Sequence, residues 1–286
     1  MKYIDLHIHT TYSDGTLSPA DIVTNAHHAG LSAIAITDHD TWGGLPEARK
    51  ASRKYNMEII RGIECSTNAC KGKLHILGYY VNPMNTELRD VLRKVRKARF
   101  ERLLKICDKL SEMGLDVDCK SEFSKNAIHS LGRPHIAMYL KEKGYVKSLG
   151  EAFGRYLGDD KPAFIEKWAP DPREIIEIIH NAGGLAVLAH PGATGKGVDN
   201  WMRWMLDAGL DGIEALYPTH SPSQQDKYRN FANQNGLVIT GGSDFHGEHS
   251  DKNLLGIFKV KYPHLEALKK RHRENFGESA KTFAEK

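Results

Sequence analysis

Two histidines near the start of the chain, His7 and His9, have the residue type and the spacing of a metal-binding pair. They lie in segment 4–9, in which apolar residues occupy every second position. Because successive side chains of a strand point to opposite faces, Asp5, His7 and His9 would share one face. Imidazole nitrogens are common ligands of transition metals, and Asp14 adds an oxygen a few residues later. Taken alone, the pattern is equally compatible with a half-buried strand that holds two hydrogen-bonded histidines.

Further histidines and acids favour the metal interpretation, because they recur where other predicted strands end. In chain order, these strand ends carry Asp38 and His39, Glu64, His190, Glu214, and Asp244 and His246. In a barrel of parallel strands, all carboxyl ends open on one face, which is where active sites lie. Separate strands would therefore deliver ligands to one bowl, a pattern that independent buried histidines would not be expected to produce.

Between these positions, strand and helix signals alternate along the chain. Strands are expected at 32–37, 57–63, 74–81, 185–189, 212–216, 237–240 and 254–260. Ser18 followed by Pro19, and later Asp171 followed by a proline, are helix N-terminus signatures. This alternation predicts an α/β fold with parallel strand pairing and right-handed crossovers.

The alternation stops between about residues 85 and 168. Apolar residues at helical spacing predict one long helix over 85–113, and shorter helices are expected at 121–126, 134–143 and 149–157. We therefore predict a discontinuous barrel domain, residues 1–84 and 169–286, and a small helical insertion domain, residues 85–168, that shapes the substrate pocket.

The polar positions of the expected long helix are strongly basic. They carry Arg89, Arg93, Lys94, Arg96, Lys97, Arg99, Arg102, Lys105 and Lys109. This face could attract the phosphates of nucleic acid. The alternative is a solvated amphipathic helix, because Asp90, Glu101 and Asp108 dilute the positive charge.

Composition limits the classes of protein to which the chain can belong. The chain has 286 residues, 40% of them hydrophobic and 27% charged, which suits one soluble α/β barrel. A net charge of +4 permits anionic ligands without itself indicating nucleic acid. The four cysteines show no Cys-x-x-Cys spacing, so we expect neither a zinc finger nor a disulfide framework. With no signal peptide and no apolar run of about 20 residues, a reducing, cytoplasmic location is expected.

The complete set of motifs resembles the PHP (polymerase and histidinol phosphatase) family of metal-dependent phosphoesterases. In order, the matching motifs are 5–10 with 13–15, 37–39, 62–64, His75, 189–191 and 243–246. The resemblance implies a distorted (β/α)7 barrel. Within the family, the segments Gly132–Ala137 and Tyr217–His220 are similar to those of 3',5'-nucleotide phosphatases and a related 5'-3' exoribonuclease.

The resemblance also implies a centre of two or three divalent metal ions. His7, His9, Glu64 and Asp244 would hold one ion, Asp14, His39 and His246 a second, and Glu64, His75 and His190 a third. Mixed imidazole and carboxylate ligands suit Mn²⁺, our first choice, or Fe²⁺ or Zn²⁺. Adjacent metals activate a water and neutralise the leaving oxygen, so no serine or cysteine nucleophile is needed. The ligands Asp14, His39, Glu64 and Asp244 are accordingly the expected catalytic residues.

Substrate contacts are expected from Arg133, His135 and His220. Arg133 precedes Pro134 at an expected helix N-terminus, where a guanidinium and free backbone N–H groups could bind phosphate. The two histidines could contact phosphate or act as a general acid. The alternatives are an ion pair for Arg133 and internal hydrogen bonds for the histidines. Glu214 points into the bowl without an assigned role.

The expected function is hydrolysis of phosphate from a nucleotide or a short oligonucleotide, with neither a membrane nor an obligate protein partner. We expect a hydrolase that acts on phosphoric ester bonds, and two alternatives stay open. Histidinol-phosphate phosphatase is the alternative among the enzymes. A non-catalytic metal- or nucleotide-binding module is the alternative from another class.

Overall fold

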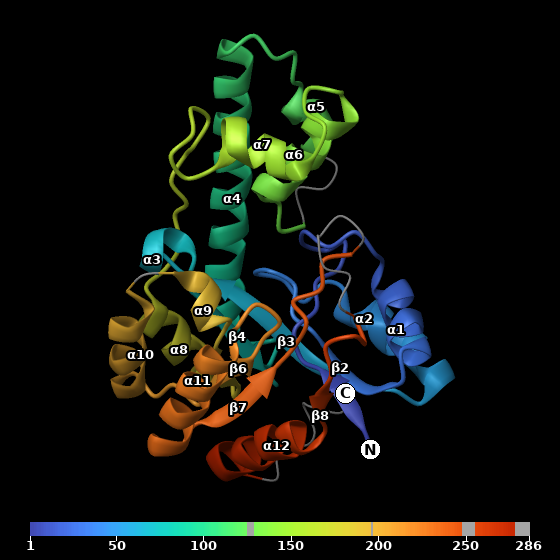
Figure 1. Cartoon of the computed structure of the whole chain (residues 1–286), viewed down its shortest axis with the longest axis vertical. Coiled ribbons are helices and arrows are strands. Elements are labelled where there is room, and N and C mark those ends of the chain that lie inside the picture. Colours follow the sequence, from blue (N-terminus) through green and yellow to red (C-terminus); the bar gives the residue numbers. More distant parts are fainter. Residues whose placement is uncertain (125–128, 196, 248–254, 278–286) are drawn as a thin grey trace.

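The computed structural model describes residues 1–124, 129–195, 197–247 and 255–277, and it arranges them as a curled β-sheet with helices around it (Figure 1). Within these residues one sheet contains β1 (Tyr3–Asp5), β2 (Leu31–Ile36), β3 (Glu58–Ser66), β4 (His75–Tyr79), β5 (Leu185–Leu188), β6 (Gly212–Leu216), β7 (Val238–Gly241) and β8 (Val260–Lys261). The strand order is β7-β6-β5-β4-β3-β2-β1-β8. The predicted α/β barrel is confirmed.

The barrel closes where the segment after β1 meets the segment after β7. Ile8 forms a parallel bridge with Phe245, and the backbone N–H of His9 donates to the Phe245 carbonyl at 2.9 Å. The N–H of Leu6 donates to the carbonyl of Gly241 at 3.2 Å. This seam therefore brings the first and last predicted ligand motifs side by side.

The expectation of parallel pairing is confirmed for β1 with β2, β2 with β3, β5 with β6 and β6 with β7, but it is wrong for β8, which pairs antiparallel with β1, and for β4. This strand pairs antiparallel with both β3 and β5, and Ser66 lies opposite His75. Only the short helix α3 (Ala69–Gly72) separates β3 from β4, whereas a parallel crossover needs a dozen or more residues. Because the chain turns straight back, His75 at the start of β4 reaches the same end of the barrel as Glu64 near the end of β3.

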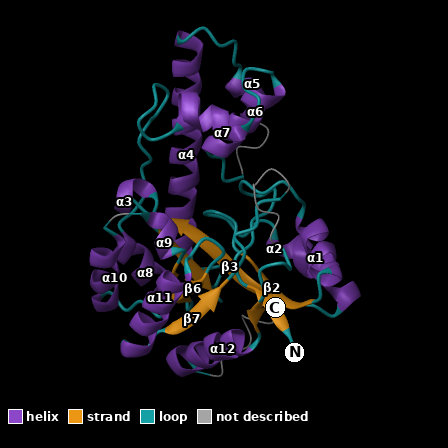
Figure 2. Cartoon of the chain, viewed as in Figure 1, coloured by secondary structure: helices purple, strands orange, loops and turns teal. Residues whose placement is uncertain are grey.

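Helices surround the strands (Figure 2). They are α1 (Pro19–His28), α2 (Leu45–Ser52) continued by the 3-10 helix η1 (Arg53–Tyr55), α8 (Pro172–Asn181), α9 (Pro191–Thr194), α10 (Val198–Asp207), α11 (Pro222–Gln234) and α12 (Pro263–Phe276). The predicted starts of α1 and α8 are confirmed, since the side chains of Ser18 and Asp171 accept hydrogen bonds from backbone N–H groups of the first turn. Along the described ranges, we find no helix with the length and apolarity needed to cross a lipid bilayer.

The insertion consists of a long helix with smaller helices along its far half (Figure 1). Its elements are α4 (Thr86–Glu112), α5 (Cys119–Phe123), α6 (Arg133–Glu142), α7 (Leu149–Ala152) and the π-helix η3 (Phe153–Leu157). They bury an apolar cluster of their own, which includes Leu103, Ile106, Leu110, Ile136 and Leu140. The predicted long helix is confirmed. Of the helix predicted at 121–126, residues 125 and 126 lie outside the described ranges.

The expectation of no disulfide is wrong for one cysteine pair. Cys107, near the end of α4, is bonded to Cys119 at the start of α5, across a Cα–Cα distance of 6.2 Å. Both residues are buried in the insertion's apolar cluster. Their separation of 12 residues is not a recognised sequence motif, and only the turn between the two helices brings the sulfurs together. Cys65 and Cys70 are free.

Replacing Cys107 and Cys119 together by alanine is expected to lower the free energy of unfolding by about 3 kcal/mol, the loop-closure value for a loop of roughly this length. Urea unfolding of the oxidised protein measures the effect, with Cys70→Ala as the control for a cysteine outside the bond. An unchanged midpoint, or ready alkylation of both thiols in the native protein, would contradict the prediction.

Candidate metal centre

Every residue that the sequence assigned to a metal lies in one connected cluster at the seam end of the barrel. The side chains form four overlapping groups, in each of which the potential ligand atoms lie within 4.8 Å of one another: His9, Asp14, His39 and His246; His7, Glu64 and His190; His7, His9 and Asp244; His39, Glu64 and His75. The structure therefore brings together residues from both ends and the middle of the chain.

Glu64 lies at the middle of this cluster and presents a different oxygen to each side. Its Oε1 is 2.8 Å from His75 Nδ1 and 2.9 Å from His190 Nε2. Its Oε2 is 3.0 Å from His39 Nδ1 and 3.2 Å from His9 Nε2. Burial raises the pKa of Glu64, but the surrounding histidines outweigh it and hold the pKa well below its ordinary value. The carboxylate is therefore ionised and suited to bridge two cations.

His7, His9 and Asp244 form the part of the cluster that spans the barrel seam. The Nε2 atoms of the two histidines are only 3.2 Å apart, and they lie 3.3 and 3.2 Å from Asp244 Oδ1. All three side chains are ligand types for a transition metal. Two ring nitrogens that converge on one carboxylate oxygen are the arrangement expected around a shared cation.

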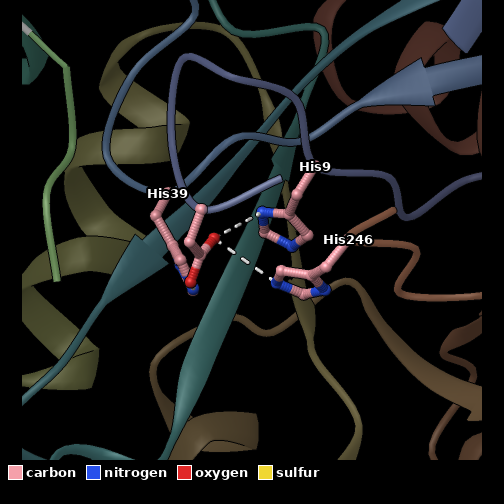
Figure 3. A group of neighbouring side chains, drawn as sticks. His9, His39 and His246 are labelled. Carbon is pink, nitrogen blue, oxygen red and sulfur yellow. Dashed lines mark ion pairs between the residues drawn. The ribbon is translucent and has the colours of Figure 1, made fainter. Parts of the chain in front are cut away.

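Asp14 contributes the corresponding oxygen to a second group. Figure 3 shows the rings of His9, His39 and His246 gathered around one carboxylate. Asp14 Oδ1 lies 3.7 Å from His9 Nδ1 and 3.4 Å from His246 Nε2, yet it has no hydrogen-bond partner among the described residues. Because buried charges are normally paired or coordinate metals, this buried oxygen fits a bound cation.

Glu214, to which the sequence gave no role, contacts the predicted ligand His7 on the side of the ring away from Asp244. Its Oε1 lies 3.1 Å from His7 Nδ1, and its Oε2 accepts a hydrogen bond from the His190 N–H at 2.9 Å. The carboxylate is completely buried. A carboxylate at Nδ1 keeps the proton there and leaves Nε2 free to face Asp244. The sequence placed Glu214 at a strand end, whereas it lies in the middle of β6, and the sequence did not reveal its partner.

Glu214→Gln is expected to weaken Mn²⁺ binding about 10- to 100-fold, the usual cost of losing a group that orients a metal-binding histidine. The amide can donate to Nδ1 and so shift the proton to Nε2, where it competes with the metal. Competition with a chelating dye measures the affinity, and Glu174→Gln on the exposed start of α8 is the control. Equal affinity in the two variants would contradict this role.

Asp38 and Asp5 both lie beside the cluster, but their roles differ from each other. Asp38 accepts hydrogen bonds from Ser13 Oγ at 2.6 Å and from Thr10 N–H, and Ser13 Oγ lies 3.2 Å from His9 Nδ1. Asp38 thus acts on His9 through Ser13. Asp5 accepts the backbone N–H of Ser243 at 2.9 Å, so it holds the barrel seam together.

Arg133, the predicted phosphate contact, is engaged within the insertion. Its guanidinium donates to Asp159 Oδ1 and to the Leu157 carbonyl, each at 2.9 Å. This ion pair is the alternative that the sequence left open for Arg133. It holds the start of α6 against the end of η3.

The two predicted substrate histidines also use both ring nitrogens internally. His135 accepts the Gly132 N–H at Nδ1 and lies 2.8 Å from the Ser13 carbonyl at Nε2, which ties the insertion to the loop before Asp14. His220 contacts the Ala215 carbonyl at Nδ1 and accepts the Gly192 N–H at Nε2, both at 3.0 Å. Burial lowers the pKa of both residues, so each is a neutral imidazole. Their contact with substrate stays a prediction.

Tyr217 makes a polar contact with the cluster. The sequence showed this residue only as part of the segment Tyr217–His220. Its hydroxyl donates to Asp244 Oδ2 at 2.7 Å, and its ring lies 5.5 Å from that of His190. The hydroxyl thereby occupies the second carboxylate oxygen of Asp244 and leaves Oδ1 facing His7 and His9.

The prediction of a basic, exposed helix face is wrong for Arg99, because this residue is buried. Its Nε donates to Asp40 Oδ2 and its Nη2 to Ser66 Oγ, both at 2.7 Å. Asp40 also accepts the Ser66 N–H at 2.8 Å, and it directly follows His39 with a positive φ of 53°. Arg99 therefore fixes α4 to the barrel beside the metal cluster and is not part of a solvated face.

The chain is similar to known phosphoesterases in both sequence and structure. The PHP domain model matches residues 5–181. A Haemophilus influenzae protein named 5'-3' exoribonuclease is 36% identical over 86% of this chain and 90% of its own length. A 3',5'-nucleoside bisphosphate phosphatase of Chromobacterium violaceum is 33% identical over 86% of this chain and 88% of its own. A crystal structure described as a metal-dependent phosphoesterase from Bifidobacterium adolescentis superposes with a TM-score of 0.87, at 28% identity, over 94% of this chain and 96% of that one.

Proposed function

This chain belongs to the PHP domain family and is a metal-dependent phosphoesterase, and from that premise we propose that it releases phosphate from nucleotides or short oligonucleotides. The observation that carries the proposal is the convergence of histidines and carboxylates on both oxygens of Glu64. Relatives that share about a third of its residues are named for nucleoside bisphosphate and RNA substrates, which favours the same substrate class here.

The proposed ligands are those that the family resemblance implied, and their side chains are suited to divalent metal ions. His7, His9, Glu64 and Asp244 would hold one divalent ion, Asp14, His39 and His246 a second, and Glu64, His75 and His190 a third. When bound, such ions supply Lewis acidity that activates a water and stabilises the charge of the phosphoryl group, and Mn²⁺, Fe²⁺ or Zn²⁺ suits these ligands. The Asp14 oxygen that accepts no hydrogen bond and the short distance between His7 and His9 support this assignment.

The protein's own groups orient this centre and limit its protonation. Glu214 holds His7, and Tyr217 holds Asp244, so each presents one defined atom to the cluster. The low pKa of Glu64 and that of Asp14, which nearby histidines lower against the effect of burial, keep both carboxylates ionised. We propose Glu64 and Asp14, together with His39 and Asp244, as the catalytic residues.

We further propose that residues 85–168 form the substrate-shaping insertion on a barrel of residues 1–84 and 169–286. His135 supports this role, because its bond to Ser13 places the insertion beside Asp14. For Arg133, His135 and His220 to bind phosphate, each would exchange an internal hydrogen bond for one to the substrate. If Arg133 makes that exchange, Asp159 keeps Lys73 as its partner.

The test is a phosphate-release screen with purified protein and added Mn²⁺. The panel contains 3',5'-bisphosphonucleosides, mononucleotides, short RNA and histidinol phosphate. We expect turnover with the nucleotide substrates. Preference for histidinol phosphate would support the other enzyme class, and metal or nucleotide binding without any phosphate release would support a binding module. Either result would overturn the proposed function.

A further inference from the structure

A cavity of about 500 Å³ lies between the first half of α4 and the segment that follows β2. Trp42 lines it from the barrel side, and Arg89, Arg93 and Arg96 line it from α4. These arginines follow one another at intervals of four and three residues, so they share one face of the helix. We call this feature the arginine groove. Its volume is within the range of small-molecule sites.

The arginine groove carries more positive charge than its surroundings neutralise. Arg89 is exposed and forms no ion pair within the described part of the chain, whereas Arg93 pairs with Asp90 at 2.9 Å. Arg96 donates to an uncharged acceptor, the backbone carbonyl of Asp40. Asp90 is the one acidic residue among those that line the groove, against three arginines, and the nearby Asp40 carboxylate is already paired with Arg99. Such a surplus attracts polyanions.

The arginine groove begins close to the metal centre. Thr41 and Trp42, which line it, are the second and third residues after the ligand His39. Three Cα–Cα steps of about 3.8 Å place Trp42 within about 11 Å of His39. Arg96 is bonded to Asp40, the immediate neighbour of His39. The groove therefore lies within reach of a chain molecule whose end is held at the metal centre.

We propose that the arginine groove binds the sugar-phosphate backbone of a single-stranded oligonucleotide whose reacting end lies at the metal centre. This inference rests on the proposed phosphoesterase function and narrows its substrate to a strand of several nucleotides. The guanidinium groups contact phosphates beyond the reacting one, and the half-buried Trp42 offers an indole against which a base can stack. Cationic grooves with aromatic side chains are the common design of sequence-independent single-strand sites.

The test compares Arg89→Ala/Arg93→Ala with Lys97→Ala/Lys105→Ala, which removes two charges from exposed positions of α4 outside the groove. At about 0.15 M salt, losing two single-strand phosphate contacts should raise KM for an oligoadenylate of roughly eight nucleotides about tenfold. The slope of log affinity against log salt should fall in magnitude by about 1.4. The control double variant should match the wild type. With 3',5'-bisphosphoadenosine, which is too short to fill the groove, both variants should keep the wild-type KM.

Fluorescence anisotropy with the same labelled oligoadenylate separates this inference from the proposed function. If the wild type releases no phosphate from any substrate, the proposed function fails, but the binding loss in Arg89→Ala/Arg93→Ala still decides whether the groove holds RNA. Equal oligoadenylate affinity in the two double variants overturns the inference. So does a wild-type KM that is the same for the oligoadenylate and the bisphosphonucleoside.

Discussion

Glu64→Ala is expected to lower the kcat of phosphate release by at least about a thousandfold, a loss of about 4 kcal/mol of transition-state stabilisation. Both oxygens of this carboxylate face histidines of the cluster, so its removal takes a ligand from more than one group at once. It also leaves several buried imidazoles without the negative charge that faces them. Bound metal should fall together with turnover, which elemental analysis of the purified variant measures.

Glu58→Ala is the matched control for this experiment. Glu58 begins the same strand, β3, but at the opposite end of the barrel, where its carboxylate contacts Tyr262 and Lys269. This control should keep its metal and most of its activity, because only a half-exposed ion pair is lost. A Glu64→Ala protein with full metal content and near-wild-type kcat would remove Glu64 from the centre of the site.

Arg99→Ala is expected to destabilise the protein by about 3–5 kcal/mol, the range for breaking a buried ion pair on one side only. Arg99 and Asp40 are both buried, and their contact of 2.7 Å joins α4 to the barrel. Burial raises the pKa of Asp40, but the Arg99 guanidinium outweighs it and the net pKa lies below the ordinary 3.8. Without Arg99, the carboxylate would stay buried without its guanidinium partner and would keep only its hydrogen bonds from Ser66.

The sign of the pH dependence follows from that lowered pKa. In the wild type, the stability contributed by Asp40 is present above the carboxyl's unfolded pKa of about 3.9 and is lost as the pH falls through the lower folded value. In Arg99→Ala, Asp40 loses the largest influence that opposes burial, so burial favours its neutral form more than in the wild type. The stability difference between the two proteins should therefore be largest near neutral pH and shrink as the pH falls below about 4.

Urea unfolding midpoints at several pH values measure this effect. Arg93→Ala is the control, since its ion pair with Asp90 is exposed and should contribute about 1 kcal/mol or less. A loss below about 1 kcal/mol in Arg99→Ala, or a deficit that does not depend on pH, would contradict the role of this pair as the attachment of α4.

The barrel and the membership of the cluster were predictable because the informative signals are local. Alternation around His7 and His9 assigns both side chains to one face, and strand ends carry Glu64 and Asp244 to a common end. The direction of β4 was missed although its cause is also local. The link between Ser66 and His75 is too short for a crossover helix, and the length of that link is visible in the sequence.

Other features depend on contacts that no local pattern encodes. Arg99 looked like one more cation on a solvated helix, and its burial depends on Asp40, 59 residues away. The bond between His135 and Ser13 spans 122 residues, and that between Glu214 and His7 spans 207. Hydrogen bonds over such separations follow from the assembled fold, so a sequence can indicate a polar residue near a site without showing which partner it has.

The seam between the segments after β1 and β7 determines the order in which this protein can fold and bind metal. Asp5 and Ser243, whose hydrogen bond spans 238 residues, must meet before His7, His9 and Asp244 share one space. Contacts of such long range form late and slowly. During synthesis from the N-terminus, the hairpin of β3 and β4 can place Glu64 beside His75 early, whereas the complete set of ligands exists only once residues 243–246 have been made. Full loading of the proposed metal ligands should therefore follow the synthesis of residues 243–246 and barrel closure, and it should serve as a marker of the finished fold.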